Sequence, residues 1–598
     1  MRIEDYGLIG DTETAALVGR NGSIDWACFP RFDSNACFAR LLGTSEHGYW
    51  SLAPVDEVRR CSRSYRPGTL VLDSEVETEG GALRFTDCMP RRGDTPDLVR
   101  RVECLRGEVK VRMELVVRFD YGRMAPWVHR VEDALLFVAG PDALVLRSDE
   151  PTRGEGLTTV AEFTLRKGER RSFVLTWFPS HHEPPRALHV DREIGKTEQF
   201  WREWSGKCTL QGPDRDAVLS SLIVLKALTY APTGGIVASP TTSLPEAPGG
   251  ARNWDYRYCW LRDATFTLSA LMYAGYRAEA EAWRDWLLRA VAGDVSKLQI
   301  MYGVAGERML AERTLPWLPG YEGAKPVRIG NAAADQLQLD VYGEVMDALF
   351  QARSLGAPPG EWSWRLQLEL LGYLEGQWHR EDQGIWEVRG GPRQFTYSKM
   401  MAWLAFDRGV RSIESGGLEG PVERFRAARD QLHEQICKQA WSSRKRAFTQ
   451  SYGSEDLDAS VLLLPLTGFL PATDPRVRDT VAAIERELLD GGLVRRYVSH
   501  DGLGGKEGVF LACSFWLADV YSLLGRRDDA RALFDRLLAL RNDLGLLAEE
   551  YDPGTRRQLG NFPQAFSHLA LVHTALNLAH QSKGPAAHRA AQGDPRRP

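Results

Sequence analysis

The sequence predicts a multidomain protein in which an antiparallel β-sandwich precedes an all-helical domain. Short alternating segments punctuated by glycine fill the first 190 residues, whereas apolar residues recur at helical spacing from Asp214 onward. The chain has 598 residues, more than one hydrophobic core usually holds. We therefore expect a β-sandwich over 1–190, a linker helix over 191–213, a helical domain over 214–582 and a disordered tail over 583–598.

The clearest predicted strands lie between residues 69 and 179. The segment TLVLDSEVETEGGALRFTDCMP (69–90) alternates between apolar and polar residues and turns at Gly80-Gly81, as a hairpin does. Three further segments repeat the alternation: 99–122, 134–148 and 157–179. Short strands at this spacing are typical of an antiparallel sandwich.

The stretch SHHEPPRALHVDRE (180–193) separates the strands from the helices. It contains His181, His182 and Glu183, which are residue types that bind metals. The prolines around them favour an interdomain linker, and we expect no metal site and no cofactor.

Twelve helical segments are predicted in the second domain: 214–230, 261–275, 276–292, 333–354, 361–379, 397–411, 421–440, 455–467, 473–489, 508–524, 526–541 and 563–581. If neighbouring helices alternate in direction, every connection from an odd to an even helix emerges at the same end of the domain. Those six connections are long and rich in Trp, Tyr, Arg, Asp and Glu, whereas the others are short. Loops on a rigid scaffold often carry function, so we expect the active site there. The six connections contain 252–264, 321–336, 381–399, 449–458, 495–510 and 547–562.

The composition excludes several classes of partner. A formal net charge of -5 gives no electrostatic reason to expect binding to nucleic acid or to an anionic membrane. Nine scattered cysteines with no CxxC pair suggest neither a zinc site nor a disulfide framework. The N-terminus lacks the pattern of a signal peptide and no apolar run reaches transmembrane length, so a cytoplasmic location is expected. The 18 tryptophans favour a ligand with flat apolar faces, such as a sugar.

Carboxylates and aromatic residues on the long connections suggest acid–base chemistry on a neutral polar ligand. Glycoside hydrolysis needs two carboxyl groups, and the best pair by context is Glu387 in GIWEVRGG and Glu549 in LAEEYDP. We expect the apolar face of Trp386 to keep Glu387 protonated. Glu549 stands beside Glu550 and Tyr551, a setting expected to keep it charged as a base.

The segment NWDYRYCWLRDA supports a sugar ligand. Arg262 and Asp263 are an adjacent donor and acceptor that together can hold vicinal hydroxyl groups. Tyr256, Tyr258 and Trp260 offer stacking faces in the same segment.

The chain resembles glycoside hydrolase family 15, the glucoamylase and trehalase family, over nearly its whole length. The motifs that match the catalytic domain are NWDYRYCWLRDATFTL, GIWEVRG, EGVFLACSFWLADV and EEYDPGTRRQLGNFPQAFSHLAL. The opening DYGLIGDTETAALVGRNGSIDWACFPRFDSNACFARLLG is similar to the N-terminal domain of bacterial trehalase-like members. The resemblance implies a β-sandwich followed by an (α/α)6 barrel, with an inverting mechanism on α-glucosides.

By position, the resemblance implies Glu387 as general acid and Glu549 as general base. It implies substrate binding by Arg262 and Asp263, and by Arg496, although Arg495 beside it leaves that register open. Val388 replaces a second acid found in fungal glucoamylases, which leaves preference beyond the first glucose open. The full set of expected substrate-binding residues is Arg262, Asp263, Trp386, Tyr256, Trp260, Arg496, Tyr551 and Glu550.

Three functions remain for comparison. The first is an exo-acting hydrolase that releases glucose from trehalose, or alternatively from α-1,4- or α-1,6-linked oligosaccharides. A disaccharide phosphorylase would need a basic, hydroxyl-rich pocket in place of Glu549, and a non-catalytic sugar-binding protein would have lost one of the two acids. Both acids are present, which favours the hydrolase. The aromatic segment GSIDWACFPRFDS further suggests that the N-terminal domain narrows the cavity, with Trp26 as the residue to test.

Overall fold

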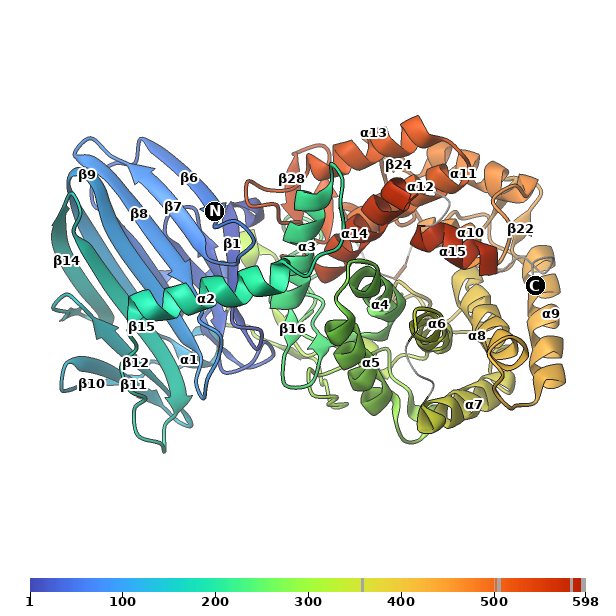
Figure 1. Ribbon diagram of the computed structural model, residues 1–598, viewed down its shortest axis with the longest axis horizontal. Coiled ribbons are helices and arrows are strands. Elements are labelled where there is room, and N and C mark those ends of the chain that lie inside the picture. Colours follow the sequence, from blue (N-terminus) through green and yellow to red (C-terminus); the bar gives the residue numbers. More distant parts are fainter. Residues whose placement is uncertain (357–359, 500, 503–506, 581–583, 593–598) are drawn as a thin grey trace.

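A computed structural model describes residues 1–356, 360–499, 501–502, 507–580 and 584–592. A strand-rich N-terminal part and a helical C-terminal part lie side by side, with helix α2 running from one to the other (Figure 1). None of the helices in these ranges is both long enough and apolar enough to cross a membrane.

The N-terminal part is built around the long strand β9 (Asp97–Val116). Its first half pairs with β8 and β15, and its second half pairs with β14 and β5, so that β9 joins two groups of strands. Every pairing in this part is antiparallel among the described strands, and β7 and β8 form the hairpin predicted at Gly80-Gly81. The other elements here are β1 (Tyr6–Gly10), β2 (Ala15–Gly19), β3 (Ser23–Cys28), β4 (Ala36–Phe38), β5 (Tyr49–Pro54), β6 (Arg60–Tyr65), β7 (Leu72–Glu77), β8 (Gly81–Cys88), α1 (Phe119–Gly122), β10 (Trp127–Val131), β11 (Ala134–Ala139), β12 (Asp142–Ser148), β13 (Arg153–Glu155), β14 (Thr158–Arg166) and β15 (Arg170–Pro179).

Helix α2 (Val190–Ser205) lies where the linker helix is predicted, and its C-terminal end is fixed to both parts of the chain. The indole N–H of Trp204 donates to Glu279 at 2.6 Å, and its ring stacks on Tyr276 at 4.2 Å between centroids. Ser205 Oγ donates to the carbonyl of Gly68 at 2.7 Å. These contacts hold the strand-rich part against the helical part.

A helix overlaps each of the twelve predicted segments, and the helix predicted over 397–411 extends beyond that segment at both ends. The helices are α3 (Arg215–Ala227), α4 (Ala264–Tyr273), α5 (Arg277–Val291), α6 (Asp340–Ser354), α7 (Glu361–Glu375), α8 (Thr396–Glu414), α9 (Val422–Gln439), α10 (Leu463–Thr467), α11 (Pro475–Glu487), α12 (Leu511–Leu523), α13 (Arg527–Leu538) and α14 (Ala565–His580). The even-numbered helices contact one another in sequence order, and α14 returns to α4, which closes a ring.

Burial explains which helices lie inside. Helices α6, α8 and α12 are buried on nearly all sides, whereas α9, α11 and α13 bury one apolar face only. A helix that is surrounded by other helices is apolar all round, and one on the outside is amphipathic.

The long odd-to-even connections contain the short strands β16 (Thr229–Tyr230), β17 (Gly235–Ile236), β18 (Cys259–Trp260), β19 (Met301–Tyr302), β20 (Arg313–Thr314), β21 (Arg328–Ile329), β22 (Trp441–Ser442), β23 (Ala447–Phe448), β24 (Leu489–Asp490), β25 (Leu493–Val494), β26 (Val509–Phe510), β27 (Glu550–Asp552) and β28 (Arg557–Leu559).

The prediction of a disordered tail over 583–598 is wrong for its central portion. Residues Pro585–Gln592 form helix α15, which packs against α10 and α14. Arg589 is 6% exposed, and its guanidinium pairs with Asp347 on α6 at 2.5 Å. This segment is rich in alanine and has few large apolar side chains, so the sequence alone does not reveal that Arg589 has a buried partner. Residues 583 and 593–598 lie outside the described ranges.

Candidate active site

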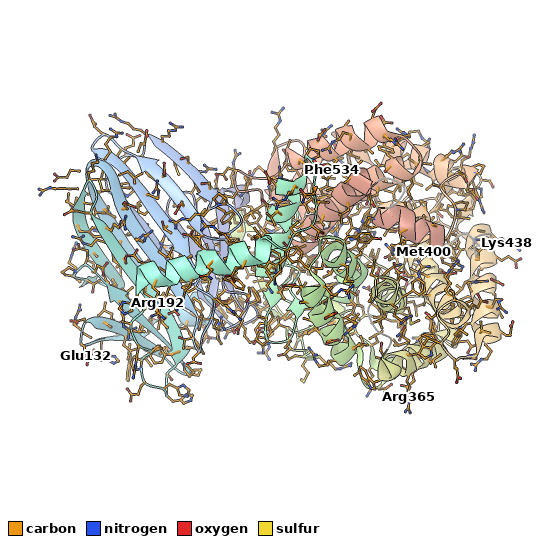
Figure 2. All side chains as sticks on the ribbon, in the orientation of Figure 1. Glu132, Arg192, Arg365, Met400, Lys438 and Phe534 are labelled. Carbon is orange, nitrogen blue, oxygen red and sulfur yellow. The ribbon has the colours of Figure 1, made fainter. Side chains whose placement is uncertain are left out.

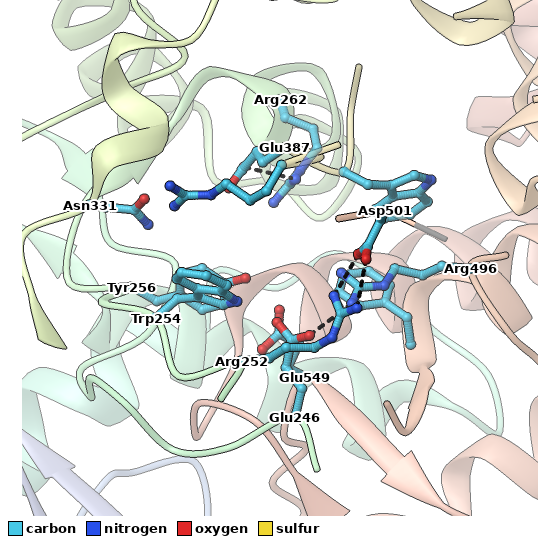
Figure 3. A pocket seen from close by; sticks show the side chains of 13 residues that line it. Glu246, Arg252, Trp254, Tyr256, Arg262, Asn331, Glu387, Arg496, Asp501 and Glu549 are labelled. Atoms are coloured by element: carbon cyan, nitrogen blue, oxygen red, sulfur yellow. Dashed lines mark hydrogen bonds and ion pairs between the residues drawn. The ribbon is translucent and has the colours of Figure 1, made fainter. Parts of the chain in front are cut away.

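A single pocket is lined by the long connections between the helices (Figure 3). Five of the six odd-to-even connections supply its walls: Glu246, Arg252, Trp254, Tyr256, Arg262, Asn331, Trp386, Glu387, Arg389, Arg496, Asp501, Phe510 and Glu549. The sixth, between α9 and α10, supplies Asp458, which accepts a hydrogen bond from the indole N–H of Trp386 at 2.9 Å. The expectation that these connections gather around one site is confirmed.

Glu387 lies in the turn region before α8 with a backbone φ of 57°, in the left-handed region. Non-glycine residues rarely adopt this conformation, and it concentrates at functional sites where other contacts hold it. Its Oε1 accepts a hydrogen bond from the indole N–H of Trp260 at 2.7 Å and lies 3.6 Å from Arg262 Nη1. A neutral donor and a cation therefore hold this carboxyl group at the pocket.

The two tryptophans beside Glu387 differ from their expected roles. Trp260 is 2% exposed and lies outside the pocket lining, so the prediction that it offers a stacking face is wrong. Its indole N–H instead supports Glu387 from behind. Trp386 does line the pocket, but the polar edge of its ring is turned to Asp458. The sequence placed both residues near the acid without showing which ring faces the cavity.

Arg262 and Asp263 lie side by side immediately before α4, as predicted. Arg262 Nε donates to Asp263 Oδ1 at 3.4 Å, and Nη1 donates to the carbonyl of Ile385 at 3.1 Å. Burial raises the pKa of the Asp263 carboxyl to about 6, although Arg262 opposes this shift. Of the pair, only Arg262 lines the pocket, and Asp263 lies behind it. Asp263 therefore orients the guanidinium that faces the ligand space.

Glu549 lines the pocket apart from Glu387, with Glu246 beside it in the view of Figure 3. It is 1% exposed, and its Oε2 atom has no hydrogen-bond partner among the described residues. Burial, followed by the charge of Glu246, raises the pKa of Glu549 from 4.5 to about 8, whereas Arg496 opposes the shift. Burial and Glu246 thus favour the protonated form of Glu549, against the expectation that its surroundings keep it charged.

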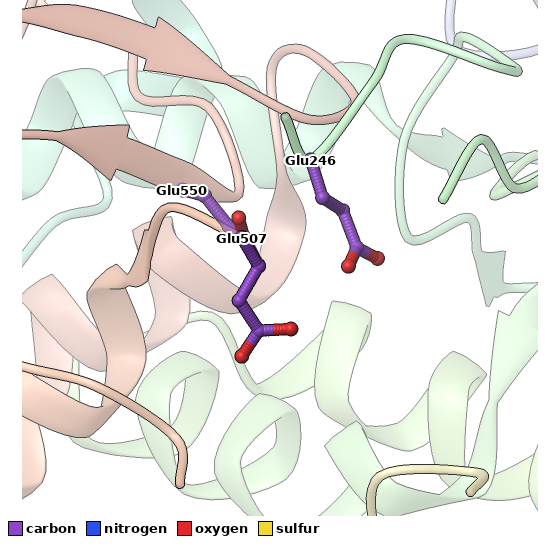
Figure 4. A group of neighbouring side chains, drawn as sticks. All are labelled: Glu246, Glu507 and Glu550. Carbon is purple, nitrogen blue, oxygen red and sulfur yellow. The ribbon is translucent and has the colours of Figure 1, made fainter. Parts of the chain in front are cut away.

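Three further carboxylates surround Arg496, the cation that opposes this shift. The Nη2 atom of Arg496 lies 2.9 Å from Glu246, 2.5 Å from Glu507 and 3.3 Å from Glu550. Figure 4 shows the three carboxylates. The three carboxylates lie within 4.8 Å of one another, a spacing that could also hold a metal ion, and the guanidinium of Arg496 lies among them. Several acids therefore share Arg496, which weakens its opposition to the raised pKa of Glu549, whose main cause is burial.

Like Trp260 and Asp263, two further residues expected to bind substrate lie outside the pocket lining. Glu550 is fully buried and contacts Arg496 instead of the cavity. Tyr551 follows it on β27, where successive side chains point to opposite faces, and it is also absent from the lining. Tyr256 does line the pocket, and its hydroxyl lowers the pKa of Glu549 against the larger effect of burial.

The sequence left open whether Arg495 or Arg496 faces the pocket, and their burial distinguishes them. Arg496 is 6% exposed and lines the pocket, with its guanidinium 5.5 Å from the ring centroid of Trp386. Arg495 points outward, where it pairs with Asp490.

Several pocket residues were not singled out from the sequence: Glu246, Arg252, Trp254, Asn331, Arg389, Asp501 and Phe510. Arg252 donates to both oxygens of Asp501, at 2.6 and 2.8 Å, across 249 residues of sequence. Arg252 and Trp254 flank Asn253 at the start of NWDYRYCW, and Arg389 follows Glu387 by two positions. Their closeness to these motifs was the signal that could have identified them as pocket residues. Glu246 carries no such signal.

The N-terminal part supports the pocket from behind. None of its first 50 residues is among the described residues that line the pocket, so the lining does not support the expectation that they narrow the cavity. Trp26 is fully buried and donates its indole N–H to the carbonyl of Pro240 at 2.8 Å. Arg257, two residues after Asp255 in the NWDYRYCW segment, donates to the carbonyl of Ser34 at 2.9 Å. These bonds fix the loop that carries Tyr256 and Arg262.

Comparison with known proteins gives two family matches and several relatives. Residues 212–576 match glycosyl hydrolases family 15, and residues 1–153 match the trehalase-like N-terminal domain. The chain is 38% identical to a trehalase of Mycobacterium tuberculosis, over 96% of this chain and 89% of that one. It is 34% identical to a trehalase of Thermoplasma volcanium, over 96% and 93% of the two chains.

Among solved structures, a bacterial glucoamylase in complex with acarbose superimposes with a TM-score of 0.73. The alignment covers 99% of this chain and 96% of that one at 13% identity, which shows a common fold. The family match spans most of the helical part, including the loops that carry Arg262, Glu387 and Glu549. The chain is a glycoside hydrolase that belongs to family 15.

Proposed function

We propose that this enzyme hydrolyses trehalose with inversion, releasing one molecule of β-glucose and one of α-glucose. The observation that carries the proposal is the similarity, over 96% of the chain, to proteins named trehalase. A pocket with two separate carboxyl groups and several side chains that bind hydroxyl groups supports it.

In the proposed mechanism Glu387 is the general acid and Glu549 is the general base. Glu387 gives its proton to the glycosidic oxygen as the bond to the anomeric carbon breaks. Glu549 takes a proton from a water molecule that attacks this carbon from the opposite face. An inverting enzyme keeps its two carboxyl groups roughly 6.5–9.5 Å apart to admit that water. We expect this separation between Glu387 and Glu549.

Binding of the first glucose is assigned to the inner part of the pocket. Arg262, oriented by Asp263, donates to sugar hydroxyl groups, and Trp386 and Tyr256 provide apolar surface. Arg496 offers guanidinium donors at the deep end, where Glu246 and Glu507 hold it. The substrate is thus expected to be a small neutral carbohydrate.

We also infer that the strand-rich part is a β-sandwich and that the helical part is an (α/α)6 barrel. The ring of contacts through the even-numbered helices supports the barrel, and the two groups of strands joined by β9 support the sandwich. The boundaries proposed for these domains are 1–190 and 214–582, with 191–213 as the linker.

A second candidate is a glucoamylase-type hydrolase of α-1,4- or α-1,6-linked oligosaccharides. The shared fold with a bacterial glucoamylase is the observation in its favour. Both candidates use the same two carboxyl groups, so they differ only in the sugar that leaves.

The test supplies trehalose, maltose and isomaltose separately and follows the anomeric protons by NMR during the first minutes. Fastest consumption of trehalose supports the proposal, and fastest consumption of maltose or isomaltose supports the second candidate. β-Glucose appearing first from maltose indicates inversion, whereas α-glucose alone would show that Glu549 is not the base. Glucose phosphate formed only when phosphate is added would indicate a phosphorylase.

The two catalytic roles are separated with α-glucosyl fluoride, whose leaving group needs no protonation. We expect Glu387→Gln to lose trehalose hydrolysis yet retain activity on the fluoride, because only the acid has been removed. Glu549→Gln should lose activity on both substrates, because the attacking water has lost its base. The opposite pattern would reverse the two assignments.

A further inference from the structure

Trp254 lies at the pocket between charged side chains that the mechanism above does not use. The guanidinium of Arg328 is 4.5 Å from the centroid of its ring, and that of Arg389 is 5.0 Å away. Glu312 links the two arginines, with Oε1 3.3 Å from Arg328 Nε and Oε2 3.6 Å from Arg389 Nη2. Trp254 and Arg389 both belong to the pocket lining.

The guanidinium groups of Arg328 and Arg389 differ in how many of their donors are already hydrogen-bonded to the protein. Arg328 Nη1 donates to the carbonyls of Ala251 and Asn253, at 2.9 and 3.1 Å. Arg328 is therefore committed to the backbone of the loop that carries Trp254. Arg389 is oriented by the ring and by Glu312, yet its separation from Glu312 is longer than a hydrogen bond. Among the residues that the structure describes, no hydrogen bond occupies its fork of N–H donors, which can therefore bind a ligand.

The pocket-lining residues of one loop differ in exposure, which suggests where Arg389 lies relative to the reacting bond. Trp386 is 8% exposed, the side chain of Glu387 is 18% exposed, and that of Arg389 is 31% exposed. Of the three residues of this loop that line the pocket, Arg389 therefore lies nearest to solvent. An acid that protonates the glycosidic oxygen lies level with the bond that breaks. A side chain outside it faces the sugar that leaves.

We propose that Arg389, held against Trp254 and Glu312, is a specificity-determining residue that binds the second glucose, the one that departs. This inference rests on the proposed hydrolysis of trehalose. Arg389 donates to hydroxyl groups of that glucose, and Trp254 provides an apolar surface beside it. Bonds from a charged donor to sugar hydroxyls are strong enough to select the second sugar.

The experiment compares Arg389→Ala with wild type on trehalose and on α-glucosyl fluoride, which has no second sugar. We expect kcat/KM on trehalose to fall by about ten- to one-hundred-fold. Activity on the fluoride should stay within about two-fold, because the first glucose and both carboxyl groups are unaffected. Arg389→Lys should recover part of the loss, since lysine keeps the charge without the planar fork.

Arg393→Ala is the matched control. Arg393 lies on the same connection but outside the pocket lining, and both of its activities should match wild type. An equal loss on both substrates in Arg389→Ala, or an unchanged rate on trehalose, would overturn the assignment of Arg389.

The proposed function fails separately, if wild type cleaves the fluoride but not trehalose. In that case the role of Arg389 is decided by a ratio: activity on the disaccharide that the enzyme prefers, divided by activity on the fluoride. This ratio is compared between Arg389→Ala and wild type. If Arg389→Ala and wild type have the same ratio, the assignment of Arg389 is overturned.

Discussion

Glu549→Gln is expected to make the protein more stable than wild type, by an amount that grows with pH. Glu549 is buried beside Glu246, and its pKa is raised from 4.5 to about 8. Between these two values the folded state keeps a proton that the unfolded state releases, so the stability of wild type falls as pH rises. Glutamine occupies nearly the same space and does not ionise in either state.

The size of the effect follows from the two pKa values. One pKa unit corresponds to about 1.4 kcal/mol, so the interval from 4.5 to about 8 sets an upper limit of about 5 kcal/mol. Glu246 and Glu550 are also raised in pKa by burial and titrate together with Glu549, so the observed difference belongs to the group and should be smaller. We expect about 2 to 4 kcal/mol above pH 8 and almost none below pH 4.5.

Thermal unfolding of both proteins from pH 5 to pH 9 measures this difference. Glu434→Gln, an exposed carboxylate on α9, is the control and should follow wild type at every pH. A constant difference across this range would refute the reasoning. A variant that becomes less stable than wild type at high pH would show that Glu549 is charged and held by Arg262 and Arg496.

Two further predictions concern contacts made far from the pocket. Trp26→Ala should lose about 3–5 kcal/mol of stability, because a fully buried indole and its bond to Pro240 are removed. Thermal unfolding measures the loss, and a changed ratio of trehalose to maltose turnover would show that the N-terminal part shapes the pocket. Arg589→Met should cost about 3–5 kcal/mol, because buried Asp347 loses one of its two guanidinium partners. A melting temperature equal to that of wild type would mean that α15 does not dock in solution, and exposed Arg365→Met is the control.

The sequence was sufficient for features that depend on neighbouring residues. A helix follows from apolar side chains that recur every three or four positions, and a hairpin follows from alternation around Gly80-Gly81. The helices and the hairpin therefore lie where they were predicted. Motif resemblance likewise placed Glu387 and Glu549 on loops that line one pocket.

Only the tertiary structure decided which side chains face the cavity and which charges are shared. Trp260 and Trp386 are equally aromatic in the sequence, yet one supports Glu387 from behind and the other lines the pocket. The raised pKa of Glu549 depends on Glu246, some 300 residues earlier, and on burial that no local pattern reveals. The partner of Arg589 lies 242 residues earlier in the chain. Local periodicity reports the conformation of a segment, whereas burial and electrostatics depend on everything that packs around it.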